Sequence, residues 1–138
     1  MLSTPKYGWG RITIGNWSDR CSYLDDVPIL LLEGVLNLYK TNNPSAIKFD
    51  AEGYGYILIF DFYQVHIITD ADDGYSLETV DILLENLTEE LISDIHRDLN
   101  LWIEWLDGEY MTNEQKKERR QELFQLINAI NEARMKNE

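Results

Sequence analysis

The stretch from Tyr54 to Thr69, with the sequence YGYILIFDFYQVHIIT, constrains the fold more than any other part of the chain. β-Branched and aromatic residues favour strands, and they make up most of this stretch. Residues 56–60 are apolar on both faces of an extended chain, which is typical of a strand in the middle of a sheet. The polar break at residues 61–63 predicts a turn. We therefore expect a central hairpin over residues 54–69, with helices covering its apolar surface.

Shorter strands are predicted on both sides of this hairpin. Residues 8–15 form a short strand between glycines, onto which residues 21–23 pair back through a turn at residues 19–20. Apolar and polar residues alternate over residues 47–51, as in a half-exposed strand. Residues 75–84 fit either helix spacing or an edge strand, and we prefer a strand followed by a loop.

The first and last of three predicted helices have clear start signals. Residues 27–41 follow Asp26, a typical cap residue, and contain Pro28, which the first turn of a helix tolerates. Residues 113–134 follow Thr112, which with Gln115 forms the pattern of a capping box. The apolar spacing of the last helix predicts which of its side chains are buried: Leu123, Leu126, Ile127 and Ile130.

A middle helix is predicted over residues 88–107, with Asn86 or Thr88 as its cap and Asp107-Gly108 as its end. Glutamates in the first turn favour this start because they interact with the helix dipole. Helical spacing identifies one core stripe, formed by Leu91, Ile95, Leu99, Trp102 and Leu106.

A second stripe on this middle helix is the candidate partner-binding site. It consists of Asp94, Asp98, Leu101 and Trp105, which are spaced i, i+4, i+7 and i+11 and lie about a quarter turn from the core stripe. One interpretation is that the last helix covers Leu101 and Trp105. The other is that Trp105 is an exposed aromatic anchor surrounded by charge, which suits a basic protein partner.

These elements together predict an α+β fold. We expect a single domain with a central, mostly antiparallel sheet of four to five strands around the 54–69 hairpin. A helix at 27–41 and two C-terminal helices, at 88–107 and 113–134, pack on this sheet. The length of 138 residues is usual for one domain, and no long flexible linker divides the chain.

Cysteine content and hydropathy indicate in which cellular compartment the protein is expected. The single cysteine, Cys21, can form no internal disulfide, and no signal-peptide pattern opens the chain, so we expect a cytoplasmic protein. The longest apolar run, Val27–Leu32, is far shorter than the roughly 20 residues that span a bilayer. No membrane association is predicted.

The chain is strongly acidic, with 25 aspartates and glutamates against 12 lysines and arginines and a formal net charge of −13. Direct binding to nucleic acid is not expected, because phosphate contacts require basic patches. Half of the basic residues fall in residues 111–138. We therefore expect the last helix to lie against the acidic remainder of the chain.

An acidic loop at Asp70, Asp72 and Asp73 raises the possibility of calcium. A calcium-binding loop has glycine at its sixth position and glutamate at its twelfth, whereas here Gly74 is fifth and Asp81 is twelfth. We therefore predict a solvated turn and no metal site.

His66 is the best candidate for acid–base chemistry, because Asp61 and Asp70 are close to it in sequence. No serine or cysteine lies in a recognisable nucleophile motif, so an ordinary packed histidine is the simpler interpretation. The glycines at 8, 10 and 15 do not form a nucleotide-binding pattern. No catalytic residue and no cofactor is predicted.

Two functions remain compatible with the sequence. The first is a small, acidic, inhibitory binding protein, of the immunity-protein, antitoxin or phage-inhibitor kind, which binds a basic protein partner by charge complementarity. The alternative is an enzyme of unrecognised type that uses His66 and nearby carboxylates. A homo-oligomer is compatible with either.

Overall fold

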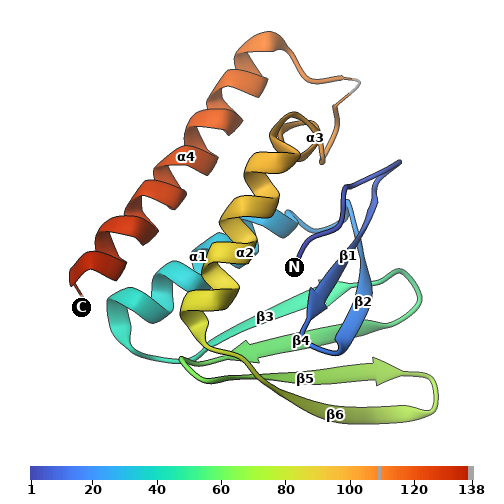
Figure 1. The fold of residues 1–138 in the computed structure, drawn as a ribbon. Coiled ribbons are helices and arrows are strands. Elements are labelled where there is room, and N and C mark those ends of the chain that lie inside the picture. Colours follow the sequence, from blue (N-terminus) through green and yellow to red (C-terminus); the bar gives the residue numbers. More distant parts are fainter. Residues whose placement is uncertain (109, 137–138) are drawn as a thin grey trace.

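A computed structural model describes residues 1–108 and 110–136 (Figure 1). Its strands form a four-stranded sheet and a separate two-stranded hairpin. The larger sheet contains four consecutive strands in chain order: β3 (Ser45–Asp50), β4 (Gly55–Phe60), β5 (Gln64–Ala71) and β6 (Gly74–Asp81). Every pair is antiparallel. The predicted α+β fold is confirmed, and the ambiguous residues 75–84 begin as a strand.

Strands β4 and β5 form the predicted central hairpin. Phe60 pairs with Val65, and the N–H of Asp61 donates to the carbonyl of Gln64 (3.1 Å). The carboxylate of Asp61 closes the turn, because it accepts the backbone N–H groups of Tyr63 (2.8 Å) and Gln64 (2.9 Å). Asp61 therefore has a structural role here.

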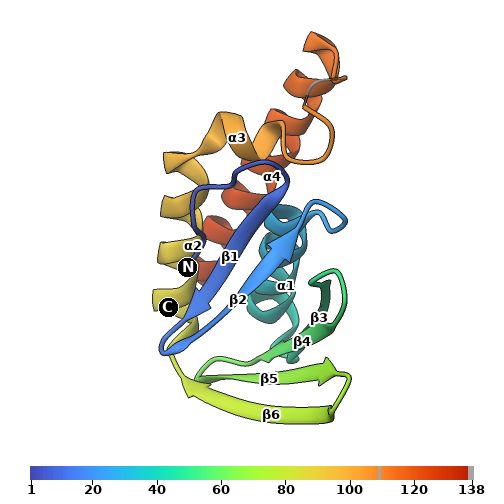
Figure 2. The same cartoon turned by 90° about the vertical axis from the view of Figure 1, so that its right-hand side faces the viewer.

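The helices lie on one face of this sheet (Figure 2). Alternate side chains of the strands point towards them and are buried, as the twofold period of a strand requires: Ile47, Phe49, Tyr56, Leu58, Phe60, Val65, Ile67 and Val80. The intervening side chains of Ile57, Ile59 and Ile68 are half-buried on the opposite face. No helix in the described part of the chain covers that face.

Helix α1 (Val27–Thr41) has the predicted bounds, with a proline in its first turn. The predicted side-chain cap is wrong: the carboxylate of Asp26 makes no capping bond, because it is bound by Arg119. Gly34 lets α1 approach the sheet closely, since a Cβ atom at this position would lie 2.7 Å from Phe60 and 2.8 Å from Ile47.

The hairpin of β1 (Trp9–Ile14) and β2 (Trp17–Ser22) crosses one end of the sheet (Figure 2). Its turn is at residues 15–16, because Ile14 pairs with Trp17. The predicted turn at residues 19–20 is therefore wrong. Gly15 supplies the positive φ of +57° that a tight hairpin turn requires, so the chain reverses four residues earlier than its polar residues suggest.

The middle helix differs most from its prediction. Helix α2 (Leu84–Arg97) begins before Thr88, whose hydroxyl donates to the carbonyl of Leu84 (2.7 Å) inside the helix. The backbone leaves helical geometry at Asp98, where φ is −117° and ψ is 35°. A short helix, α3 (Leu99–Ile103), follows. The single helix predicted over 88–107 is therefore two helices, ending before Asp107.

Helix α4 (Asn113–Lys136) starts with the predicted capping box. The N–H of Thr112 donates to Gln115 Oε1 (2.8 Å), and the N–H of Gln115 donates to Thr112 Oγ1 (3.1 Å). The predicted core positions are buried, except that Leu126 is only partly covered. The helix runs antiparallel to α2 and crosses α1 (Figure 1).

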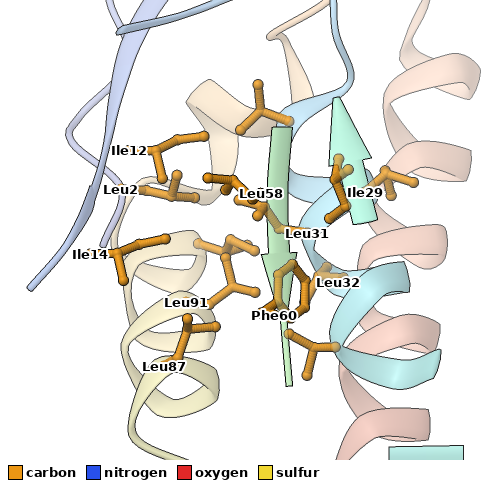
Figure 3. Packing of buried hydrophobic residues seen from close by; sticks show 14 of the residues in the cluster. Leu2, Ile12, Ile14, Ile29, Leu31, Leu32, Leu58, Phe60, Leu87 and Leu91 are labelled. Atoms are coloured by element: carbon orange, nitrogen blue, oxygen red, sulfur yellow. The ribbon is translucent and has the colours of Figure 1, made fainter. Parts of the chain in front are cut away.

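One hydrophobic cluster joins the hairpin, α1, α2 and the sheet. Figure 3 shows Ile12 and Ile14 of β1 beside Leu87 and Leu91 of α2, facing Phe60 of β4. Among the described residues, no helix combines the length and the apolar character that crossing a bilayer demands.

Candidate functional site

A hollow of about 590 Å³ lies where the N-terminal segment meets the end of α3. We call it the tyrosine groove. Its walls are formed by the segment before β1, the residue after β2, and α3 with the loop that follows it: Pro5, Lys6, Tyr7, Gly8, Tyr23, Leu101, Glu104, Trp105, Leu106, Asp107, Gly108 and Tyr110. All three tyrosines in this lining are exposed: Tyr7 by 91%, Tyr23 by 46% and Tyr110 by 77%.

Tyr7 stands at the tip of a tight turn. The N–H of Lys6 donates to the carbonyl of Trp9 (2.8 Å), and the N–H of Trp9 donates to the carbonyl of Lys6 (3.0 Å). Both central residues have positive φ, +54° for Tyr7 and +78° for Gly8, which is the pattern of a type I′ turn. Glycine adopts this geometry freely, whereas the left-handed conformation costs a residue such as tyrosine roughly 1–2 kcal/mol.

Close packing fixes the orientation of this turn. A Cβ atom on Gly8 would lie 2.9 Å from the ring of Tyr23, so the backbone of the turn rests directly on that ring. The ammonium group of Lys6 lies 5.3 Å from the centre of the Tyr7 ring. The fold therefore accepts a strained backbone and presents an almost fully exposed aromatic ring, a combination that is typical of functional positions.

Two of the predicted partner-binding residues, Asp94 and Asp98, hold the N-terminal segment in place. Asp94 Oδ2 accepts the N–H of Leu2 (2.8 Å), and Asp98 Oδ2 accepts the hydroxyl of Thr4 (3.0 Å). Arg97 binds both carboxylates at 2.9 Å and donates to the carbonyl of Leu2 (2.8 Å). These acids are used within the fold and do not line the groove.

The other two predicted residues, Leu101 and Trp105, do lie together in the groove wall. The prediction that Trp105 is exposed is wrong: it is only 6% exposed, its ring centre lies 5.1 Å from that of Trp102, and its Nε1 donates to the carbonyl of Asp25 (2.8 Å). The break at Asp98 rotates the chain, so the four residues do not share one helical stripe. Leu101 is 43% exposed. Leu106, which is predicted in the core, is 39% exposed, so that prediction is wrong.

A second hollow of about 470 Å³, the acidic cleft, lies at the end of the large sheet. Its charged lining residues are Asp25, Lys48, Asp50, Asp70 and Asp72. Two members of the predicted acidic loop therefore line it, while Asp73 does not. In residues 1–108 and 110–136, no three His, Cys, Asp or Glu side chains are arranged to hold a metal ion.

The carboxylate of Asp25 is perturbed by its position in the acidic cleft. Partial burial raises the pKa of Asp25 above its ordinary value, and the nearby charge of Asp50 raises it further. The backbone N–H of Asp50, which donates to Asp25 Oδ2 (2.7 Å), acts in the opposite direction. Because Trp105 binds the carbonyl of the same residue, Asp25 connects the wall of the tyrosine groove to the acidic cleft.

His66, the candidate for acid–base chemistry, lies on the open face of the sheet. Its Nδ1 is 2.8 Å from Thr79 Oγ1 on the neighbouring strand. Asp61 is used in the hairpin turn. The cysteine offers no nucleophile, because Cys21 is fully buried and burial raises its pKa to about 12. The enzyme alternative remains a prediction, and the hydroxyl that lies beside His66 is that of Thr79.

Sequence reasoning missed the tyrosines at positions 7, 23 and 110. A usable signal existed for Tyr7, because a residue–glycine pair between Lys6 and Trp9 can form a two-residue turn and place its first side chain at the tip. No such local signal marks Tyr23, which lies under the turn that carries Tyr7, or Tyr110, whose N–H donates to the carbonyl of Asp107 in the loop after α3.

Comparison with known proteins gave no match of this chain to any protein-family model, curated protein or solved structure.

Proposed function

We propose that this chain is a protein-binding module, and that the tyrosine groove receives apolar side chains of a basic partner. The observation that carries the proposal is Tyr7, which is 91% exposed on a strained turn beside a groove of about 590 Å³. Tyrosines are enriched among the residues that dominate binding energy at interfaces. Leu101, Leu106 and Tyr110 supply further apolar surface along the same hollow.

Charge supports a basic partner. The chain has a formal net charge of −13, and the groove wall contains two carboxylates, Asp107 and Glu104, of which Glu104 is paired with Lys116, and one lysine, Lys6. The acidic cleft begins on the other side of Asp25, so a partner seated in the groove would meet more carboxylates beyond its edge. Such a field raises the rate of association with a positive surface.

The finer proposal is an inhibitory protein of the immunity, antitoxin or phage-inhibitor kind. An inhibitor of this kind acts by covering a positive functional cleft, which requires a rigid, acidic surface with an apolar anchor. The hydrogen bonds from Asp94, Arg97 and Asp98 to the N-terminal segment support this, because they hold the turn that carries Tyr7.

A photo-crosslinking amino acid placed at position 7 would identify the partner in cells that make the protein. The matched control is the same amino acid at Tyr63, which is 70% exposed in the β4–β5 turn. We expect a crosslinked basic protein from position 7 and not from position 63. Equal crosslinking from both positions would contradict a specific site.

The affinity of that partner then tests the anchor. Tyr7→Asn keeps a residue that tolerates positive φ and removes the ring, so we expect binding to weaken by about 2 kcal/mol or more with no loss of thermal stability. Tyr63→Asn should leave affinity unchanged. The association rate should also fall as the salt concentration rises. An association rate that does not depend on salt would refute the role of charge.

A further inference from the structure

Strand β6 is an open edge of the four-stranded sheet and lies farthest from the helices (Figures 1 and 2). All its residues except Val80 are exposed, and they include two large apolar side chains, Tyr75 (79%) and Leu77 (68%). An exposed edge is a template for a further strand, and proteins often protect such edges with lysine or proline. Strand β6 contains neither, although two carboxylates, Glu78 and Asp81, lie on it.

The ladder with β5 determines which backbone groups of β6 face outwards. The N–H of Ile82 donates to the carbonyl of Tyr63, which continues the β5–β6 register by one pair. Backbone groups in an antiparallel ladder point alternately to the two sides of a strand. The N–H and C=O groups of Tyr75, Leu77 and Thr79 therefore face the free edge, available to another chain.

We propose that two copies of this chain associate through β6, antiparallel about a twofold axis at Leu77. In this register Leu77 lies opposite its own symmetry mate, Tyr75 lies opposite Thr79, and Ser76 lies opposite Glu78. All the outward-facing backbone groups of Tyr75, Leu77 and Thr79 then pair with one another. Such an interface uses the same surface on both subunits, as a twofold dimer requires.

Side-chain chemistry selects this register over its neighbours. An axis at Glu78 would place two carboxylates directly opposite each other, which is destabilising. An axis at Ser76 would leave Thr79 opposite Asp73, outside the strand. With the axis at Leu77, two aromatic–β-branched pairs and one leucine pair form at the centre of the ladder, and these are favourable cross-strand combinations. The like-charge pairs of this register, Asp81 opposite Asp73, fall at the ends of the ladder, where Asp73 lies beyond the strand.

The same pairing would extend a row of apolar side chains across the open face of the sheet. Leu77 is in register with Ile68 on β5, and Ile68 is in register with Ile57 on β4. This apolar row ends at Leu77, which is exposed in a single copy. In the dimer the row continues through the second Leu77 into the partner's isoleucines, so the exposed leucine becomes the middle of an uninterrupted apolar strip.

Net charge distinguishes this association from binding to a basic partner. Each copy carries −13, so the two copies repel each other and added salt should tighten the dimer by screening. Binding of a basic protein in the tyrosine groove should weaken with salt. The two proposals use different surfaces, so either can fail without the other.

Sedimentation of the purified full chain tests the dimer, at about 0.1 mM protein and about 0.15 M salt. We expect a dimer for the natural chain and for Tyr63→Glu, which adds a charge at an equally exposed site elsewhere. Leu77→Glu should be monomeric, because it sets two carboxylates against each other, and it should melt at the same temperature as the natural chain diluted until that chain is also monomeric. A monomeric natural chain, or a dimer that survives Leu77→Glu, would overturn the proposal.

Cysteine crosslinking tests the register. Opposite residues in a hydrogen-bonded antiparallel pair have Cα atoms about 5.5 Å apart, which a disulfide can bridge. Leu77→Cys should therefore oxidise readily to a covalent dimer, and a mixture of Tyr75→Cys with Thr79→Cys should give the mixed dimer. Faster self-crosslinking of Glu78→Cys than of Leu77→Cys would exclude the axis at Leu77.

Discussion

Single residues show that the acidic side chains of this chain have two kinds of role. Asp26, Asp94 and Asp98 are bound by arginines and by the N-terminal segment, so they stabilise the fold. Asp25 is different, because burial disfavours its charged form and the pKa of its carboxyl is raised. A protein that keeps a carboxylate in an unfavourable position sacrifices stability there, as is common at binding surfaces.

The raised pKa of Asp25 predicts the sign of a pH effect. Between the ordinary pKa of an aspartate, about 4, and the raised value, the folded state binds more protons than the unfolded state, so stability falls as pH rises. Above the raised value the penalty is complete. Asp25→Asn, which retains an acceptor for the Asp50 N–H, should therefore raise the free energy of unfolding at pH 7.

Urea unfolding across this pH range measures the effect. The gain in Asp25→Asn should shrink as the pH falls towards about 4 and vanish below it, where the natural carboxyl is protonated in both states. Asp72→Asn, in the same cleft and exposed, changes the net charge equally and serves as the control. A gain that is independent of pH would refute this explanation.

Local sequence patterns predicted those helices and strands well that depend on interactions between residues close in sequence. The hairpin of β4 and β5, the bounds of α1 and the capping box of α4 depend on propensity, proline and short-range hydrogen bonds, and all are confirmed. The break at Asp98 was missed because the apolar spacing continues through it, and the carboxylate of Asp98 binds Thr4, which is remote in sequence. No periodicity within residues 88–107 records that contact.

The candidate site was predicted less well for the same reason. Helical spacing correctly placed Leu101 and Trp105 on a common surface, but it could not show that α2 ends between Asp94 and Leu101. Nor could it show that Trp105 has a buried acceptor, the carbonyl of Asp25, eighty residues earlier. The exposed residues of the groove, Tyr7 and Tyr110, lie in loops, where the spacing of residues along the sequence does not indicate which way a side chain points.

The contact between α1 and the sheet gives a prediction at the scale of elements. Alanine favours helix over glycine by about 1 kcal/mol, so propensity alone predicts that Gly34→Ala stabilises α1. The added Cβ would lie 2.7 Å from the Phe60 ring, and overpacking costs typically 1–3 kcal/mol. Because the steric term is larger, we expect net destabilisation.

A double variant separates the two effects in thermal unfolding. Phe60→Leu should make room for the new methyl group, so adding Gly34→Ala to Phe60→Leu should cost less than adding it to the natural chain. Stabilisation by Gly34→Ala alone would show that α1 can move away from the sheet.

On the scale of the whole molecule, the basic last helix is held against the acidic remainder, as predicted from the charge distribution. Lys116 binds Glu104, and Arg134 binds Glu89. The most buried of these cations is Arg119, only 7% exposed, which donates two hydrogen bonds to Asp26 and one to the carbonyl of Trp102. It thereby joins α4 to the start of α1 and to α3.

Removal of this guanidinium should therefore loosen three helices together. Arg119→Met should cost about 3 kcal/mol, the lower end of the range for a broken buried pair, because Asp26 keeps some contact with water. Arg120→Met, at the next and exposed position, should change stability by less than about 0.5 kcal/mol. Equal effects in chemical denaturation would show that Arg119 contributes no more than a surface charge.

The hydrogen bonds that hold the N-terminal segment can form only late in the synthesis of the chain. Leu2 and its partner Asp94 are 92 residues apart, so a ribosome that adds about 5–20 residues per second makes the second about 5 to 20 seconds after the first. The strands of the large sheet, by contrast, pair only with their sequence neighbours and can assemble during that interval. The bonds to Asp94 are thus the last that the N-terminal segment gains, and a nascent chain stalled before residue 94 would hold the turn that carries Tyr7 only through nearby partners such as Trp9 and Tyr23.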